Sequence, residues 1–152
     1  MAVIEVTLEG FENAQKVLNN LAEQIERPGQ KVMDRLGEAV IDDIDNRFMT
    51  RGYGTWANLK PATWKRKKSG TILIETGEMF AGTRIDWTTD NDVSVSINKP
   101  SKPAVPGYHQ TGTTHMVARP LVEVTPKLEK ELVEVVHKWV EDMLRAFEAE
   151  VS

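Results

Sequence analysis

The three histidines are the residues of this chain whose chemistry most readily serves catalysis or metal binding. His109 and His115 are separated by five residues in a stretch rich in proline and glycine, and with Asp86 or Glu75 close by they could hold a metal ion. Histidines in loops more often form hydrogen bonds or face water, so we expect no metal site here. His137 lies among acidic residues of a predicted helix and is interpreted as a surface residue.

Signatures of the main enzyme classes are missing from the sequence. The chain has no cysteine, which excludes thiolate metal sites, cysteine nucleophiles and a disulfide framework. It also has no spaced nucleophile, zincin or phosphate-loop motif. We therefore expect a protein that is not an enzyme, with no catalytic residue and no cofactor.

A basic run with an adjacent tryptophan, Trp64-Lys65-Arg66-Lys67-Lys68, imitates a nucleic-acid contact. Its four positive charges could displace counterions from phosphates, but the net charge of the chain is −4 and would repel DNA. We favour a solvated loop or a protein contact here, and keep a nucleic-acid-binding module as the alternative function.

Charge is unevenly distributed along the chain. Residues 1–45 carry ten acidic and four basic side chains, residues 46–120 carry five and eleven, and residues 121–152 carry eight and four. The net charges of −6, +6 and −4 suit a chain that docks on copies of itself or on other subunits. A solvated surface of mixed charge is the plainer interpretation.

Length and composition indicate one soluble domain spanning residues 1–152. Apolar residues make up 40% and charged residues 28% of the chain, as in ordinary globular folds. We expect no signal peptide, because the N-terminus has no basic segment followed by an apolar run. No apolar stretch approaches the roughly 18 residues that a membrane span requires, so we expect no membrane contact.

Apolar spacing predicts long helices at both ends of the chain. The first begins at Phe11 and is broken by Pro28-Gly29, and a second should end near Thr50. The last helix has Thr125 as its cap and Pro126 at its first position. The inner stripes are Val32, Met33, Leu36, Val40, Ile44 and Phe48 in the second helix, and Leu128, Leu132, Val135, Val136, Trp139, Val140, Met143 and Phe147 in the last.

Strict alternation of apolar and polar residues predicts the strands. Residues 2–9 read as a first strand, and residues 85–88 and 93–97 read as a hairpin around Asp90-Asn91. Residues 121–124, with Val117, are expected to return as short edge strands. Just before the hairpin, Thr76 is the expected N-cap of a short helix over residues 78–81.

Two segments show neither period and are predicted to be long loops. Residues 51–71 contain three glycines and two tryptophans, with room for one helical turn, and residues 99–116 contain three prolines and two glycines. The predicted fold is α+β, with a small antiparallel sheet and its β-hairpin packed against long N- and C-terminal helices.

Four short pieces in order carry a resemblance to a known family. They are Gly52-Tyr53-Gly54-Thr55-Trp56-Ala57-Asn58-Leu59 with Thr63 and Lys67, then Leu73-Ile74-Glu75-Thr76-Gly77-Glu78-Met79, then Tyr108-His109-Gln110-Thr111-Gly112, then Ala118-Arg119-Pro120-Leu121. This series resembles the phage virion morphogenesis family, the tail-completion proteins of Mu-like and P2-like tailed phages and prophages. The similarity extends from the first helix to the last.

The resemblance implies a non-catalytic structural subunit at the junction between tail and head. Such proteins form rings, commonly hexamers, that contact the tail tube or tail terminator and the head connector. The location implied is the virion neck, assembled in the cytoplasm of the bacterial host. Trp56 and Leu59 would anchor the first loop, Gly77 would permit a turn, and Arg119-Pro120 would set the entry to the last strand. The candidate subunit or partner contacts are Tyr53, Trp56, Trp64, Lys65, Arg66, Lys67, Lys68, Tyr108, His109, Gln110 and Arg119.

Overall fold

The long helices and the hairpin form an elongated α+β fold. The structure is a computed structural model that describes residues 11–151, with side chains described from residue 15 to residue 150. The predicted strand over residues 2–9 lies outside the described residues. The elements in order are α1 (Phe11–Glu26), α2 (Gln30–Thr50), α3 (Pro61–Arg66), α4 (Glu78–Ala81), β1 (Thr83–Thr88), β2 (Val93–Ile97), α5 (Val105–Thr111) and α6 (Pro126–Val151).

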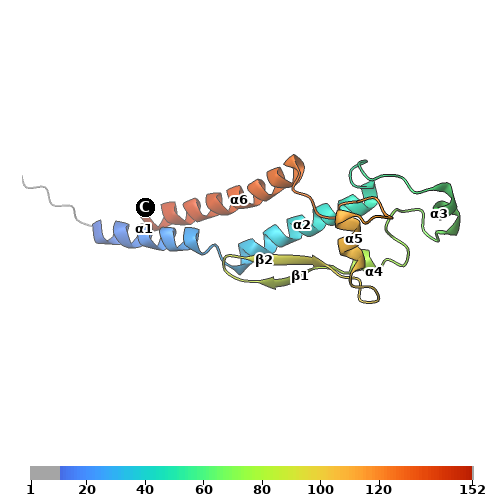
Figure 1. Ribbon diagram of the computed structural model, residues 1–152. Helices are drawn as coiled ribbons and strands as arrows, with labels where there is room; N and C mark the ends of the chain where they lie inside the picture. Colours follow the sequence, from blue (N-terminus) through green and yellow to red (C-terminus); the bar gives the residue numbers. More distant parts are fainter. Residues whose placement is uncertain (1–10, 152) are drawn as a thin grey trace, which may run out of the picture.

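Helix α2 is the central element. It packs against α6 on one side and against the β1–β2 hairpin on the other, while α6 continues past it to pair with α1 (Figure 1). The expected stripe of α2 is realised, since Val32, Met33, Ile44 and Phe48 are buried. The helix ends at Thr50, as its sequence predicts. Its start is held to the hairpin turn, because Gly29 N donates to Asp90 O at 2.9 Å.

The hydrophobic core lies around the C-terminal half of α2. Phe48 is fully buried and meets the rings of Trp56 and Phe80 edge to face, at centroid distances of 6.0 and 5.4 Å. Such pairs add stability beyond the area that they bury. The remaining buried members of this cluster are Ile44, Ile72, Met79 and Leu121. The core therefore joins α2 to the loops that follow it in sequence.

The predicted hairpin is confirmed. β1 and β2 pair antiparallel, with an irregularity between Ile85 and Trp87 that sets Trp87 opposite Ser94. The hairpin approaches α2 closely at Gly37, where a Cβ atom would lie 2.9 Å from side-chain atoms of Ile85 and Val93. Trp87 is 54% exposed.

The first predicted loop contains the single helical turn for which it has room, α3. The short helix over residues 78–81 is also present as α4, but its expected cap is wrong. Gly77 occupies the N-cap position, in the left-handed conformation at φ 82°, while the Oγ1 of Thr76, one residue earlier, accepts a hydrogen bond from Glu78 N at 3.4 Å. Glycine adopts this conformation without steric cost, which agrees with the turn that Gly77 was expected to permit.

Two predictions for the second loop region are wrong. Residues 99–116 are not an extended loop throughout, because α5 begins there with Pro106 in its first turn, where a proline costs no hydrogen bond. The expected edge strands at Val117 and residues 121–124 do not form within the described chain. Backbone groups of Leu121, Val122 and Glu123 are bonded by side chains instead, as described below.

Helix α6 begins as its sequence predicts. Thr125 Oγ1 accepts a hydrogen bond from Leu128 N at 3.2 Å, and Pro126 is the first helical residue. Its apolar stripe is only partly covered. Leu128 and Met143 are buried, whereas Val133 and Val136 are 59% and 40% exposed.

Replacing Trp139 by alanine tests how much of this stripe is covered. Trp139 is half-buried, so we expect the free energy of unfolding to fall by about 2 kcal/mol, below the 3–5 kcal/mol typical of a fully buried tryptophan. Urea unfolding of the isolated chain measures this loss, with Trp139→Phe as the milder control. A loss above about 4 kcal/mol would mean that the site is more enclosed than this structure has it.

Candidate functional site

Several of the segments that carry the family resemblance meet in one cluster. Trp56 Nε1 donates to Pro120 O at 3.0 Å, and Arg119 reaches back to donate to Ala57 O at 2.8 Å and Asn58 O at 3.2 Å. Both side chains are buried. Trp56 therefore anchors the first loop, as expected. Arg119 binds backbone carbonyls of the same loop, and no strand follows it within the described chain.

The glycines of the first loop make this contact possible. Arg51, Gly52, Tyr53 and Gly54 all have positive φ, between 55° and 81°. Such a left-handed turn costs roughly 1–2 kcal/mol for each residue other than glycine. At Gly52 a Cβ atom would also lie 2.3 Å from the ring of Trp56. The Gly-Tyr-Gly spacing thus reverses the chain and directs Trp56 into the core.

Gln110 replaces the strand pairing that residues 121–124 were expected to make. Its side-chain oxygen accepts from Leu121 N and Val122 N at 2.9 and 3.0 Å, while its Nε2 donates to Val122 O at 2.6 Å. One amide side chain therefore satisfies donors and an acceptor that a neighbouring strand would otherwise bind. Gln110 is a structural residue in this cluster.

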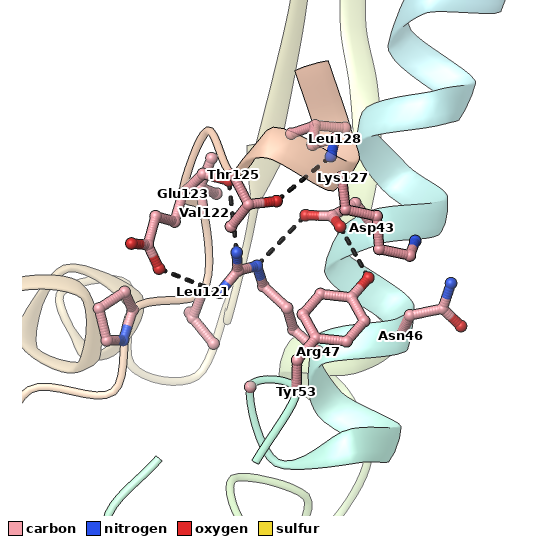
Figure 2. A network of polar contacts seen from close by, with 12 residues as sticks. Asp43, Asn46, Arg47, Tyr53, Leu121, Val122, Glu123, Thr125, Lys127 and Leu128 are labelled. Atoms are coloured by element: carbon pink, nitrogen blue, oxygen red, sulfur yellow. Dashed lines mark hydrogen bonds and ion pairs between the residues drawn. The ribbon is translucent and has the colours of Figure 1, made fainter. Parts of the chain in front are cut away.

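A buried ion pair that the sequence interpretation missed lies beside this cluster. Arg47 Nε donates to Asp43 Oδ2 at 3.2 Å, and both side chains are 1% exposed (Figure 2). Arg47 also donates to Glu123 O at 3.3 Å, and Tyr53 Oη donates to Asp43 Oδ1 at 2.7 Å. The spacing of four residues, next to Val40 and Ile44 on the helix, is the signal that could have revealed this pair.

Tyr53 closes the network from the solvent side. Its ring lies 5.4 Å from the guanidinium of Arg47 and 5.2 Å from Lys127 Nζ. Burial, and then the hydrogen bond to the Asp43 carboxylate, raise the pKa of Tyr53 above its ordinary value. The network joins α2, the first loop and the start of α6.

The basic run divides into three exposed side chains and one internal one. Lys65, Arg66 and Lys68 are exposed and form no ion pair within 4 Å among the residues described. The side chain of Lys67 is 8% exposed, and its Nζ donates to Ile74 O and, at 2.9 Å, to Glu75 Oε2. Lys67 and the backbone N–H of Lys68 hold the pKa of the Glu75 carboxyl below its ordinary value.

The aromatic residues of the candidate contacts differ in exposure. Trp64 is half-buried, with Nε1 donating to Asn58 Oδ1 at 3.0 Å and the Arg51 guanidinium 5.3 Å from its ring centroid. Tyr108 is half-exposed. Trp56, Lys67, Gln110 and Arg119 are committed to internal contacts, so Tyr53, Trp64, Lys65, Arg66, Lys68 and Tyr108 are the candidates that present atoms to a partner.

The two loop histidines do not come together as a metal site. His115 is exposed, whereas His109 is half-buried, and its Nδ1 is buried without a hydrogen-bond partner. Across the described part of the chain, no three His, Cys, Asp or Glu side chains are grouped so as to hold a metal ion. Burial, with the positive charges of Arg119 and Lys99, lowers the pKa of His109 below its ordinary value of 6.5.

This lowered pKa predicts a pH dependence of stability. Because folding favours the neutral imidazole, the unfolded chain binds the proton more readily, and the free energy of unfolding should fall as the pH drops through 6.5. In melts between about pH 7.5 and 5, His109→Gln should lose part of this fall. His115→Gln is the matched control and should keep it. An unchanged profile for His109→Gln would contradict this account.

Several large apolar side chains among the described residues are exposed. A groove of about 470 Å³ between α2, β2 and α6 is lined by Leu36, Val40, Val93, Leu132, Val133 and Val136, with Glu129 at its edge. Other large apolar side chains are exposed at Leu18, Ile25, Met49, Val117, Val124 and Leu144. Exposed apolar surface on this scale marks interaction sites in soluble proteins.

The total exposed area of the chain is large for its mass. The chain exposes 10823 Å², against about 7,800 Å² for a compact monomer of its mass. An elongated molecule exposes more surface than a compact one of the same mass, in keeping with the shape in Figure 1.

No helix within residues 11–151 is both long and apolar enough to cross a bilayer.

Comparison of the chain with models of protein families, with curated proteins and with solved structures finds no match.

Proposed function

We propose that this protein is a non-catalytic structural subunit of a tailed phage or prophage, completing the tail and joining it to the head. It would act as a ring, most simply a hexamer, in contact with the tail tube or tail terminator and the head connector. Its place would be the neck of the virion, after assembly in the bacterial cytoplasm. The ordered resemblance of its loop segments to the virion morphogenesis family is the source of this proposal.

The observation that carries it is the uncovered apolar surface of an otherwise well-bonded fold. The loop segments are fixed internally by Trp56, Gln110 and Arg119, so the chain has a defined shape before assembly. Yet Leu18, Ile25 and Val133 are each more than half exposed. A subunit whose described residues leave several large apolar side chains exposed supports a role in assembly.

Measurement of mass and shape tests the ring. We expect light scattering at increasing protein concentration to show assembly, and electron microscopy to show closed rings or, with tail tubes added, rings capping their ends. A chain that stays monomeric at its highest soluble concentration and does not bind tail tubes would refute the proposal.

Nucleic-acid binding is the alternative function, and one observation favours it. Lys65, Arg66 and Lys68 follow Trp64 in sequence, are exposed, and form no ion pair among the described residues, as in surfaces that contact phosphates. If these three contact DNA, binding should weaken with salt at a log–log slope of about −3. A DNA titration at several salt concentrations decides this point.

A further inference from the structure

We propose that the opposite ends of this chain are the two halves of one head-to-tail contact between copies. The arm consists of α1 and the C-terminal half of α6 (residues 15–26 and 137–150), and the basic end consists of residues 51–75 and 98–119. The arm of one copy would dock on the basic end of the next. This inference rests on the proposed ring and names the surfaces that would close it.

The structure separates charge along its long axis. The basic end carries nine lysines and arginines and one acidic residue, Glu75, whereas the arm carries six acidic and three basic residues. They lie at opposite ends of the molecule, α3 at one and the paired α1 and α6 at the other (Figure 1). Helix α6 alone is about 39 Å long, well beyond the screening length of about 8 Å. The two ends therefore cannot neutralise each other within one chain.

The basic end combines cations with an apolar hollow. Lys65, Arg66 and Lys68 are exposed without ion pairs among the described residues. Beside them lies a hollow of about 390 Å³, whose walls include Leu59, Leu73 and Val105 with Arg66, Lys99 and the ion pair of Lys67 with Glu75. A partner segment that fits this surface must carry both apolar side chains and carboxylates.

The arm carries both exposed apolar side chains and carboxylates. It is only two helices thick, so Leu18, Ile25 and Leu144 remain 45–57% exposed. Around them are the exposed carboxylates of Glu23, Glu148 and Glu150, none of which forms an ion pair in the described chain. Glu23, Glu26 and Glu150 also line an open notch of about 630 Å³ between the two helices. The arm is thus the matching surface in both charge and polarity.

Charge also decides the symmetry of the contact. Two arms meeting face to face would oppose carboxylates, and two basic ends would oppose ammonium and guanidinium groups, at a cost that suppresses both pairings. The arm and the basic end attract, which favours a heterologous contact. Contacts of this type repeat around a ring when the rotation closes.

Charge reversal tests the contact. Variant A is Lys65→Glu/Arg66→Glu/Lys68→Glu, which leaves the internal Lys67 in place, and variant B is Glu23→Lys/Glu148→Lys/Glu150→Lys. Each alone should self-associate at least about 100-fold more weakly than the unmodified chain, because like charges then face each other. Mixed in equal amounts, A and B should assemble again, since each altered end finds an opposite charge. The control Glu38→Lys/Asp42→Lys, at exposed sites within α2, should assemble normally.

The outcomes separate this inference from the proposed function. Circular dichroism and melting first establish that A and B fold. If the unmodified chain assembles and either variant assembles equally well, or the mixture stays monomeric, the head-to-tail contact is refuted while the ring stands. A chain that never assembles refutes both. If variant A assembles normally but loses salt-dependent DNA binding, the basic end is a nucleic-acid surface and this inference is overturned.

Discussion

Replacing Arg47 by alanine is expected to lower the free energy of unfolding by about 3–5 kcal/mol. Arg47 and Asp43 are both 1% exposed and 3.2 Å apart. Without the guanidinium, the Asp43 carboxylate keeps only the hydroxyl of Tyr53 as a partner in this network (Figure 2). The Glu123 carbonyl also loses its donor. An unpaired buried charge is among the most destabilising defects that a single substitution can make.

The double variant Asp43→Leu/Arg47→Met is the informative control. Removing both charges and keeping apolar volume should restore most of the stability, since a buried ion pair contributes little net free energy once its desolvation is counted. Urea unfolding of the two variants and the unmodified chain gives the comparison. If the single and double variants are equally unstable, Arg47 acts through the shape of its side chain and its bonds to residue 123 rather than through Asp43.

The helices and the hairpin were predictable because their apolar residues follow a local period. In α2, the stripe from Val32 to Phe48 is the stripe that is buried, and burial of one face is what makes such a helix stable. In β2 the alternation of Val93, Val95 and Ile97 likewise matches the observed pairing. In α2 the burial of a residue follows from its neighbours three or four positions away, whereas all five residues of β2 are half-buried and Trp87, two positions from Ile85, is 54% exposed.

The loops were not predictable, since their bonding is set by residues distant in sequence. Residues 121 and 122 read as strand, but their backbone groups are bonded by the side chain of Gln110. No local pattern reveals that a glutamine will take the place of a strand. Similarly, the three prolines of residues 99–116 argue against helix, yet Pro106 falls in the first turn of α5, where it is tolerated.

The candidate contacts show the same limit. Lys65 and Lys67 are neighbours of one type in one basic run, yet Lys65 is exposed and Lys67 is bonded to Glu75 and a carbonyl inside the loop. Arg119 also looks like a surface residue in sequence and is buried. Residue type shows which side chains could bind a partner, and only their position in the fold shows which ones are free.

Replacing Trp56 by alanine should also cost about 3–5 kcal/mol, because it opens a cavity in the core. Trp56 is 6% exposed, packs edge to face on Phe48, and donates its indole N–H to Pro120 O at 3.0 Å. The left-handed turn at residues 51–54 precedes Trp56 and directs it into the core, so the substitution removes the packing contact that this turn makes possible. The turn would keep its conformational cost without the packing that offsets it.

Two further variants separate the loss of apolar packing from the loss of the hydrogen bond to Pro120 O. Trp56→Phe keeps most of the apolar volume and leaves the Pro120 carbonyl without its donor, so we expect a loss of about 1–3 kcal/mol. Trp87→Ala removes the same side chain from a site that is 54% exposed and should change stability by much less. Denaturant midpoints at constant slope measure all three. Equal losses for Trp56→Ala and Trp87→Ala would show that Trp56 does not anchor the loop, and that the left-handed turn is held by other contacts.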